Sequence, residues 1–267
     1  MLTNVTMGQY YPVDSPIHRL DPRIKIVLTI ALIVAVFLVH TLAGYALILG
    51  FIWMTARLAR VPFSMLLKGI RPLRMIMIFT FVLNLFFTAG DQVLVEFWII
   101  RITMEALRQA VFYTLRLVFL VIGTSLLTLT TSPVSLSDGI ELLLGPLKKI
   151  RFPAHELAMM MTIALRFIPT LLDETDKIMK AQMARGADFE SGNLISRAKS
   201  MVPLLVPLFV SAFRRAGDLA MAMESRCYHG GEGRTRFRVL KLTRNDGYAC
   251  CAMALLIGLI VLEGIFL

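Results

Sequence analysis

Apolar residues gather into long runs that are separated by short polar or charged segments. A helix needs roughly 20 predominantly apolar residues to cross a bilayer. Five runs reach that length, some only with help from their flanking residues. We therefore predict five transmembrane helices, at residues 24–39, 41–56, 74–90, 111–131 and 248–267.

Only His40 separates the first two of these runs. The pattern fits either a tight hairpin of two short spans or one long helix with a break. We favour the hairpin.

Two further apolar runs are predicted to lie outside the bilayer interior. Residues 156–172 contain Arg166 near the middle and Pro169 shortly after it, and residues 201–213 are short and contain two prolines. A lone arginine at the bilayer centre costs at least about 2.5 kcal/mol on insertion scales. We expect both runs to be buried against protein or to lie at the membrane interface. Arg116, inside a predicted span, is expected to lie near an interface or to be paired.

The composition supports a membrane protein, because 57% of the residues are hydrophobic and only 17% are charged. The net charge of +10 is then best explained by basic cytoplasmic loops, so no nucleic-acid partner is expected. Residues 57–74 contain five basic residues and no acid, whereas residues 89–108 carry a net charge of −1. The positive-inside rule therefore predicts a cytoplasmic N-terminus and a cytoplasmic segment at 132–247.

The segment at 132–247 is too long for a simple connector. We predict three helices in it: a short one at 135–147, capped by Ser137, and two long ones from about Glu156 to Arg185 and from about Leu194 to Cys227. The predicted domains are accordingly 1–131 with four spans, 132–247 as a cytoplasmic domain, and 248–267 as the last span.

Both long helices end in a small residue, an arginine and another small residue. The first end is Ala184, Arg185, Gly186 and the second is Ser225, Arg226, Cys227. Each could be a plain helix stop, since arginine favours the last turn and glycine often follows it. Together they could also form a paired docking surface, because an arginine offers a fixed fork of donors to a partner's carboxylates or carbonyls.

The sequence shows few signs of a catalytic site or a metal site. Its four histidines lack metal-ligand spacing, and its three cysteines form no metal-binding pair, so no metal site is predicted. It has no GxxxxGK[ST] phosphate loop, so any ATP and Mg²⁺ would be bound by another subunit. The alternatives are a stand-alone membrane transporter, for which we see no internal repeat, and a membrane-embedded enzyme, for which the only acidic cluster is "DETD" at 173–176.

Four segments in order resemble one known family. "SPIHRLDPRIKI" near the start, "ALRFIPTLLDE" in the first long cytoplasmic helix, and the ends "ARG" and "SRC" are similar to the transmembrane T component of energy-coupling factor vitamin transporters. The opening "MGQYYPVDSPIHRLDPR" resembles the T proteins of shared modules more than those dedicated to cobalt or biotin.

The resemblance implies an all-α, L-shaped scaffold in the bacterial plasma membrane, with about five transmembrane helices and about three coupling helices. It implies a non-catalytic subunit that transmits the motion of two cytoplasmic ABC-type ATPases to an interchangeable vitamin-binding membrane S component. The six residues of the two helix ends are then the expected ATPase-docking residues. Ser225 and Cys227 depart from the family's usual Ala-Arg-Gly, while Arg226 keeps the central position.

Overall fold

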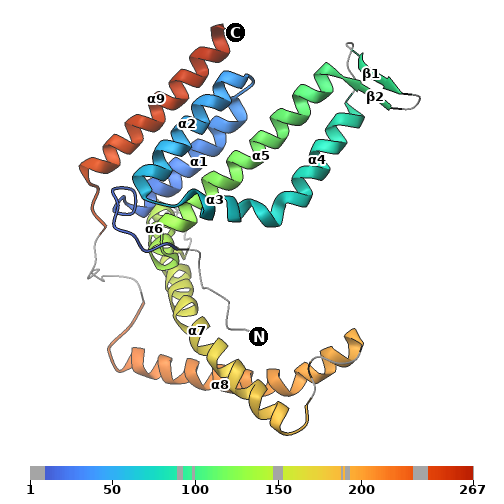
Figure 1. Ribbon diagram of the computed structural model, residues 1–267. Coiled ribbons are helices and arrows are strands. Elements are labelled where there is room, and N and C mark those ends of the chain that lie inside the picture. The colour runs from blue at the N-terminus through green and yellow to red at the C-terminus, as the bar shows by residue number, and fades with distance from the viewer. Residues whose placement is uncertain are drawn as a thin grey trace. The chain divides into compact units, whose positions relative to one another are not determined.

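The computed structural model describes residues 10–88, 93–97, 100–146, 153–187, 189, 193–230 and 240–266 (Figure 1). The described chain is almost entirely helical, which confirms the predicted all-α class. Its helices are α1 Pro22–Leu38, α2 Leu42–Ala59, α3 Phe63–Ile70, a 3-10 turn Arg71–Leu73, α4 Arg74–Phe87, α5 Met104–Thr130, α6 Pro133–Leu143, α7 Ala154–Ala184, α8 Leu194–Glu224 and α9 Arg244–Phe266.

One small antiparallel strand pair lies between α4 and α5, where we predicted only a loop. Strand β1 (Val93–Phe97) pairs with β2 (Ile100–Thr103), so that Glu96 stands opposite Arg101. Both segments are rich in valine and isoleucine, which favour extended backbone. The loop that joins the predicted third and fourth spans is therefore a hairpin.

Five helical segments of the described chain are long and apolar enough to cross a membrane, which confirms a multi-pass membrane protein. They are Leu42–Ala59, Phe63–Phe87, Met104–Thr130, Ala154–Ala184 and Arg244–Ile265.

Four of the five correspond to predicted spans. The first predicted span is α1, which has only 17 residues and is shorter than the five. Helix α7 has the required length and composition although we predicted that it lies outside the bilayer interior. Arg166 and Pro169 both lie within this helix.

The predicted hairpin between the first two spans is confirmed. Helix α1 ends at Leu38, Val39 is extended, and α2 begins at Leu42. The hydroxyl of Thr41 accepts a hydrogen bond from the Gly44 N–H at 3.2 Å and so caps α2. The first helix therefore ends and the second begins within four residues, with Thr41 as the cap of the second.

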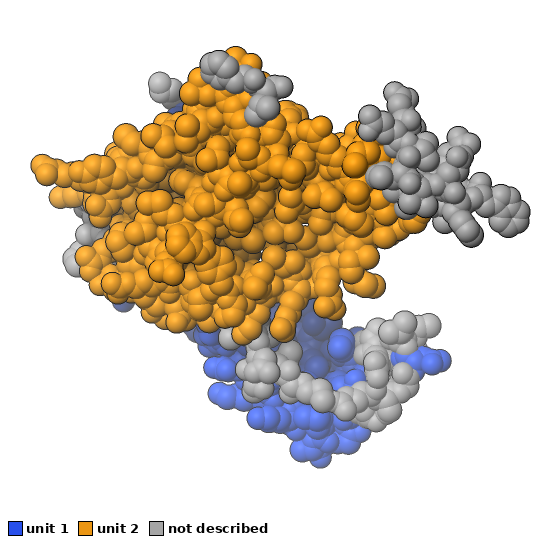
Figure 2. Space-filling view, turned by 45° about the horizontal axis from the view of Figure 1, so that its top comes forward, with its two compact units in different colours: residues 1–7, 140–239 blue, residues 8–139, 240–267 orange. Residues whose placement is uncertain are grey.

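The chain divides into two compact units, residues 1–7 with 140–239 and residues 8–139 with 240–267 (Figure 2). The second of these contains α1 to α5 and α9. In it, α5 packs against α1, α2, α3 and α4, and α9 packs against α1 and α2. The fully buried side chains of Val36, Ile48 and Ile52 lie at the centre of its core.

The outer faces of the same helices are apolar as well. Val34 is 51% exposed, Leu49 is 52% exposed and Leu262 is 52% exposed. A helix that is hydrophobic on all sides is typical of a membrane span. This bundle therefore presents to lipid the kind of surface that a soluble protein would bury.

Arg116 lies in this bundle and contacts the end of α1, with no ion pair among the described residues. Its guanidinium donates to the carbonyl oxygen of Val39 at 3.4 Å and lies 5.1 Å from the ring centroid of Phe37 and 5.5 Å from that of Tyr113. These contacts between α5 and the end of α1 offset part of the cost of desolvating the cation.

The other compact unit contains α7 and α8, which pack on each other (Figure 1). Arg215 of α8 donates to Glu174 of α7 at 2.6 Å. Leu204 is 8% exposed, while Leu208 and Ala212 on the same side of α8 are partly buried. The ion pair between Arg215 and Glu174 therefore links α8 to α7.

The predicted cap of the short helix at 135–147 is wrong. Helix α6 begins at Pro133, and the Ser132 hydroxyl accepts the Ser135 N–H at 3.2 Å. Proline is favoured in the first turn because it has no N–H to satisfy, so the start moves to the Ser-Pro step. Ser137 lies inside the helix and donates to the Pro133 carbonyl oxygen at 3.0 Å.

Candidate docking site at two helix ends

The end of α7 at Ala184, Arg185 and Gly186 has a defined backbone geometry. The Arg185 N–H donates to the Gln182 carbonyl at 3.0 Å, the Gly186 N–H donates to Met183 at 2.9 Å, and the Ala187 N–H donates to Gln182 at 3.0 Å. Gly186 has a φ of +88°, the left-handed conformation that glycine adopts without cost. This is the Schellman motif, in which the N–H groups of two residues just beyond the helix donate to carbonyl oxygens of its last turn.

The end of α8 repeats that geometry 41 positions later. The Arg226 N–H donates to the Met223 carbonyl at 3.1 Å, the Cys227 N–H donates to Glu224 at 2.8 Å, and the Tyr228 N–H donates to Met223 at 3.0 Å. Cys227, with a φ of +57°, takes the left-handed position. In both ends the arginine immediately precedes the left-handed residue.

The departure from Ala-Arg-Gly therefore leaves the backbone of the second end intact. A non-glycine residue in the left-handed region costs roughly 1–2 kcal/mol. Cys227 carries that cost, and the ending forms nevertheless. The same ending also closes α2, where Arg60 itself has a φ of +55°, so the bonding pattern alone does not distinguish the two arginine ends.

All six predicted docking residues are exposed: Ala184, Arg185, Gly186, Ser225, Arg226 and Cys227. Within the described residues, neither Arg185 nor Arg226 forms an ion pair. Each arginine thus presents an exposed guanidinium at the end of a helix of 31 residues. Such a group can donate to carboxylates or carbonyl oxygens of another protein.

A cavity of about 610 Å³ lies between α7 and the end of α8. Arg226 and Cys227 line it together with Arg166 of α7, while Met159 and Phe167 contribute apolar walls. Arg185 does not line it. The structure therefore places the second end beside a groove and leaves the first end outside it.

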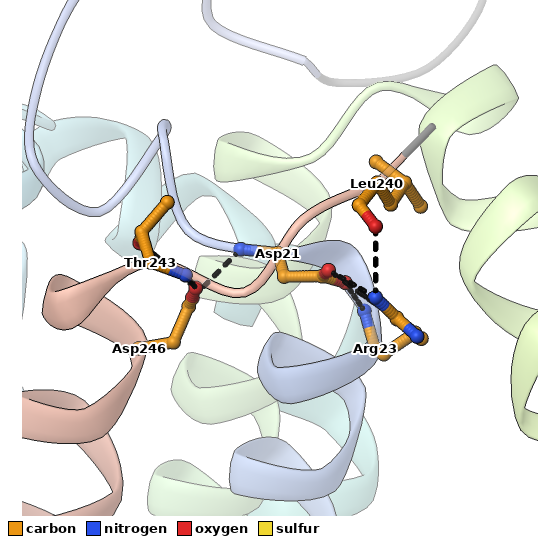
Figure 3. Close-up of polar contacts among 5 residues, drawn as sticks. All are labelled: Asp21, Arg23, Leu240, Thr243 and Asp246. Atoms are coloured by element: carbon orange, nitrogen blue, oxygen red, sulfur yellow. Dashed lines mark hydrogen bonds and ion pairs between the residues drawn. The ribbon is translucent and has the colours of Figure 1, made fainter. Parts of the chain in front are cut away.

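The segment "HRLDPR" forms a polar network whose role the sequence did not reveal (Figure 3). The Asp21 carboxylate accepts hydrogen bonds from the backbone N–H and the guanidinium of Arg23 at 2.9 Å and 2.8 Å. Asp246, at the start of α9, accepts the Asp21 N–H at 2.8 Å. Thr243 donates to the other oxygen of Asp246 through both its N–H and its hydroxyl.

This network ties α9 to the beginning of α1. The Arg23 guanidinium also reaches the carbonyl oxygen of Leu240 at 3.3 Å (Figure 3). Asp21 is only 4% exposed; burial opposes its ionisation, but the hydrogen bonds and charge of Arg23 outweigh burial and lower the pKa of Asp21. Aspartate followed by proline is a recognised helix-start signal and could have indicated the cap, but no sequence signal indicates Asp246.

Lys25 extends the network to α5. It is 6% exposed, and its ammonium donates to the carbonyl oxygens of His18 at 3.1 Å and Thr130 at 2.9 Å. The segment "SPIHRLDPRIKI" near the start of the chain thus connects one end of the first predicted span to the fourth and to the last. In the described part of the chain, no group of three or more histidine, cysteine or acidic side chains could hold a metal ion.

Several known proteins are similar in sequence to this chain over nearly its full length. A family described as "Cobalt transport protein" matches residues 14–237. "Energy-coupling factor transporter transmembrane protein EcfT" of Clostridium kluyveri is 54% identical over 267 residues, covering 100% of this chain and 99% of the relative. Proteins of the same name from Thermosediminibacter oceani and Bacillus subtilis are 58% and 48% identical, over 96% and 97% of this chain and 96% and 98% of theirs.

The resemblance stated from four short segments is therefore confirmed over the whole chain. Five apolar helices agree with the word "transmembrane" in the name that these relatives share. The chain belongs to the family of transmembrane proteins of energy-coupling factor transporters.

Proposed function

We propose that this protein is the non-catalytic coupling subunit of an energy-coupling factor importer in the bacterial plasma membrane, with its N-terminus in the cytoplasm. Two ABC-type ATPases, which bind the ATP and Mg²⁺, dock on the ends of α7 and α8. An exchangeable membrane S component binds the vitamin and takes up the motion. This subunit then passes movement between partners and carries out no reaction itself.

The observation that carries the proposal is the repeated geometry of the two helix ends. Three equivalent backbone hydrogen bonds, a left-handed residue and an exposed arginine recur at Arg185 and Arg226. A helix stop needs only one glycine or asparagine and no specific side chain before it. Two exposed arginines in the same backbone position, one at the end of each long helix, suit two binding partners.

A second surface supports the S component. One side of α8 is strongly exposed and apolar, with exposures between 49% and 75% at Met201, Val202, Leu205, Val206, Phe209, Val210 and Phe213. Exposed apolar patches of this kind mark interaction with protein or membrane. An apolar membrane partner that rests on α8 would cover this stripe.

The proposal is tested by co-purifying the full-length protein with two candidate ATPases and a candidate S component. We compare the wild type with Arg185→Glu plus Arg226→Glu at equal membrane expression. The control is Lys180→Glu plus Arg214→Glu, which makes the same change of charge on exposed positions of the same two helices.

We expect the first variant to lose the ATPases and keep the S component, and the control to keep both. Undiminished ATPase binding in the first variant would contradict docking at the two ends. Equal loss in both variants would assign the effect to net charge instead.

A further inference from the structure

A pocket with two arginines lies where α2 ends and α3 begins. Its volume is about 410 Å³. Its charged members are Arg57 and Arg60, and its aromatic members are Tyr11, Trp53 and Phe63. Neither the helix ends nor the network at Asp21 includes these arginines, so the proposed coupling function does not account for them.

The backbone holds Arg60 in an unusual conformation. Its φ is +55° and its ψ is +30°, and its N–H donates to the Arg57 carbonyl at 3.1 Å. The next residue, Val61, is 5% exposed and donates to the Ala56 carbonyl at 3.2 Å. This is the helix ending already described for α2, and it fixes the position of Arg60 at the corner between the two helices.

The two guanidinium groups lack a neutralising carboxylate among the described residues. The Arg57 guanidinium lies 4.9 Å from the ring centroid of Trp53, and Arg60 donates to the backbone carbonyl oxygen of Asp14 at 3.4 Å. The carboxylate of Asp14 is the nearby acid, and Arg19 already binds it with two bonds of 2.7 Å and 2.5 Å. The pocket therefore keeps a net positive charge.

The pocket also lies at the end of a candidate membrane span. Helix α2 is long and apolar enough to cross a membrane and ends at Ala59, so a bilayer around it would place Arg57 and Arg60 at its surface in either orientation. Tryptophan and tyrosine favour this interface. Helix α3 follows at once and opens the candidate span Phe63–Phe87, so the corner between α2 and α3 lies between two candidate spans.

From these observations we infer that the pocket binds the phosphate of an anionic phospholipid. Paired arginines suit a phosphate because their planar donors match its oxygens, and the aromatic rings of Trp53 and Phe63 can lie along the glycerol and upper acyl region. The bound lipid would fix the corner between α2 and α3. The inference rests on α2 as a membrane span, and it holds or fails independently of ATPase docking.

The test measures thermal unfolding of the full-length protein in detergent with added phosphatidylglycerol, phosphatidylcholine or inorganic phosphate. The variant Arg57→Gln plus Arg60→Gly removes both cations and leaves the left-handed backbone easier to form. The control variant, Lys68→Gln plus Arg71→Gln, removes two exposed cations from the neighbouring segment but outside the pocket.

We expect phosphatidylglycerol to raise the unfolding midpoint of the wild type and the control, and to have no effect on the pocket variant. Phosphatidylcholine and inorganic phosphate should leave all three midpoints unchanged. A phosphatidylglycerol effect that persists in the pocket variant, or that is lost equally in the control, overturns the inference. If inorganic phosphate raises the unfolding midpoint as much as phosphatidylglycerol does, the pocket binds a free anion and not a lipid.

A second measurement needs no change in the pocket. The chain has two tryptophans, so Trp98→Phe leaves Trp53 as the only one. In nanodiscs, bromine-labelled phosphatidylglycerol at a low mole fraction should quench Trp53 fluorescence more than the same fraction of bromine-labelled phosphatidylcholine. Equal quenching by the two lipids would mean that the site does not select an anionic headgroup.

Discussion

Cys227 occupies in α8 the backbone position that Gly186 occupies in α7. Both have positive φ angles, +57° and +88°, and both donate to the carbonyl oxygen three residues earlier. The two positions differ in conformational free energy, because a residue with a side chain is disfavoured in the left-handed region by roughly 1–2 kcal/mol. This equivalence allows the stability of one helix end to be changed without touching its arginine.

Cys227→Gly should strengthen the end of α8. The gain is expected to be about 1 kcal/mol at most, because glycine removes the left-handed cost but loses more chain entropy on folding. Hydrogen exchange of the Tyr228 amide, which donates to Met223, should slow in this variant. Cys227→Val should speed the same exchange. Identical exchange in all three proteins would contradict the assigned conformation of Cys227.

Gly186→Ala provides the reciprocal experiment in α7. Apart from its chain neighbours, no atom of the described residues lies within 4 Å of a Cβ placed at Gly186, so we expect the effect to come from backbone strain and not from a clash. We expect a loss of about 1 kcal/mol at this end, seen as faster exchange of the Ala187 amide. An unchanged rate would show that α7 does not end in the left-handed conformation.

The ion pair between Glu174 and Arg215 is expected to stabilise the contact of α7 with α8 modestly. The two side chains are 22% and 37% exposed, so solvent screens the pair and its coupling energy should be small. A double-mutant cycle with Glu174→Gln and Arg215→Gln, followed by thermal unfolding, measures it. A coupling energy of zero would mean that this ion pair does not contribute to holding the two helices together.

The buried Asp21 makes stability depend on pH. Its pKa is lowered in the folded protein, so it stabilises the fold above its ordinary pKa of about 3.9 and loses that contribution as the pH falls further. Asp21→Asn should destabilise the protein by about 1–3 kcal/mol at pH 7, since it breaks the charged bonds to Arg23. The wild-type and variant unfolding midpoints, recorded from pH 7 to pH 3, should converge toward the acid end. Parallel curves would exclude Asp21 as the titrating group.

The sequence predicted the helices well because apolar runs and helix stops act locally. The hairpin at His40 and both long helices follow from such signals. The cap of α6 was missed because Ser132 and Ser137 both fit a cap, and the proline after Ser132 decided between them. The bond between Asp21 and Asp246 joins positions 225 residues apart, and no local pattern encodes such a contact.

The candidate docking site shows the same division between local and long-range information. Arg185 and Arg226 were proposed as docking residues from their small neighbours, which are local. That Arg226 borders a cavity with Arg166 depends on how α7 packs against α8, and it could not be read from spacing. The ion pair between Arg215 and Glu174 likewise joins two helices, and no local pattern indicates it.

The exposed apolar stripe of α8 gives the last prediction, which separates the two halves of the proposed function. Val206 is 59% exposed and Phe209 is 60% exposed, so Val206→Asp plus Phe209→Asp changes surface and not core. Burying two carboxylates beneath an apolar partner without hydrogen bonds is costly, so the S component should be lost on co-purification while both ATPases remain.

The control for this prediction is Ala216→Asp plus Ala220→Asp, which places two carboxylates at exposed positions of α8 beyond the stripe. It should retain every partner. Joint loss of ATPases and S component in the stripe variant would show that α8 itself had unfolded or that the two contacts depend on each other. Retention of the S component would instead assign the stripe to lipid, and the coupling surface would have to be sought on α7.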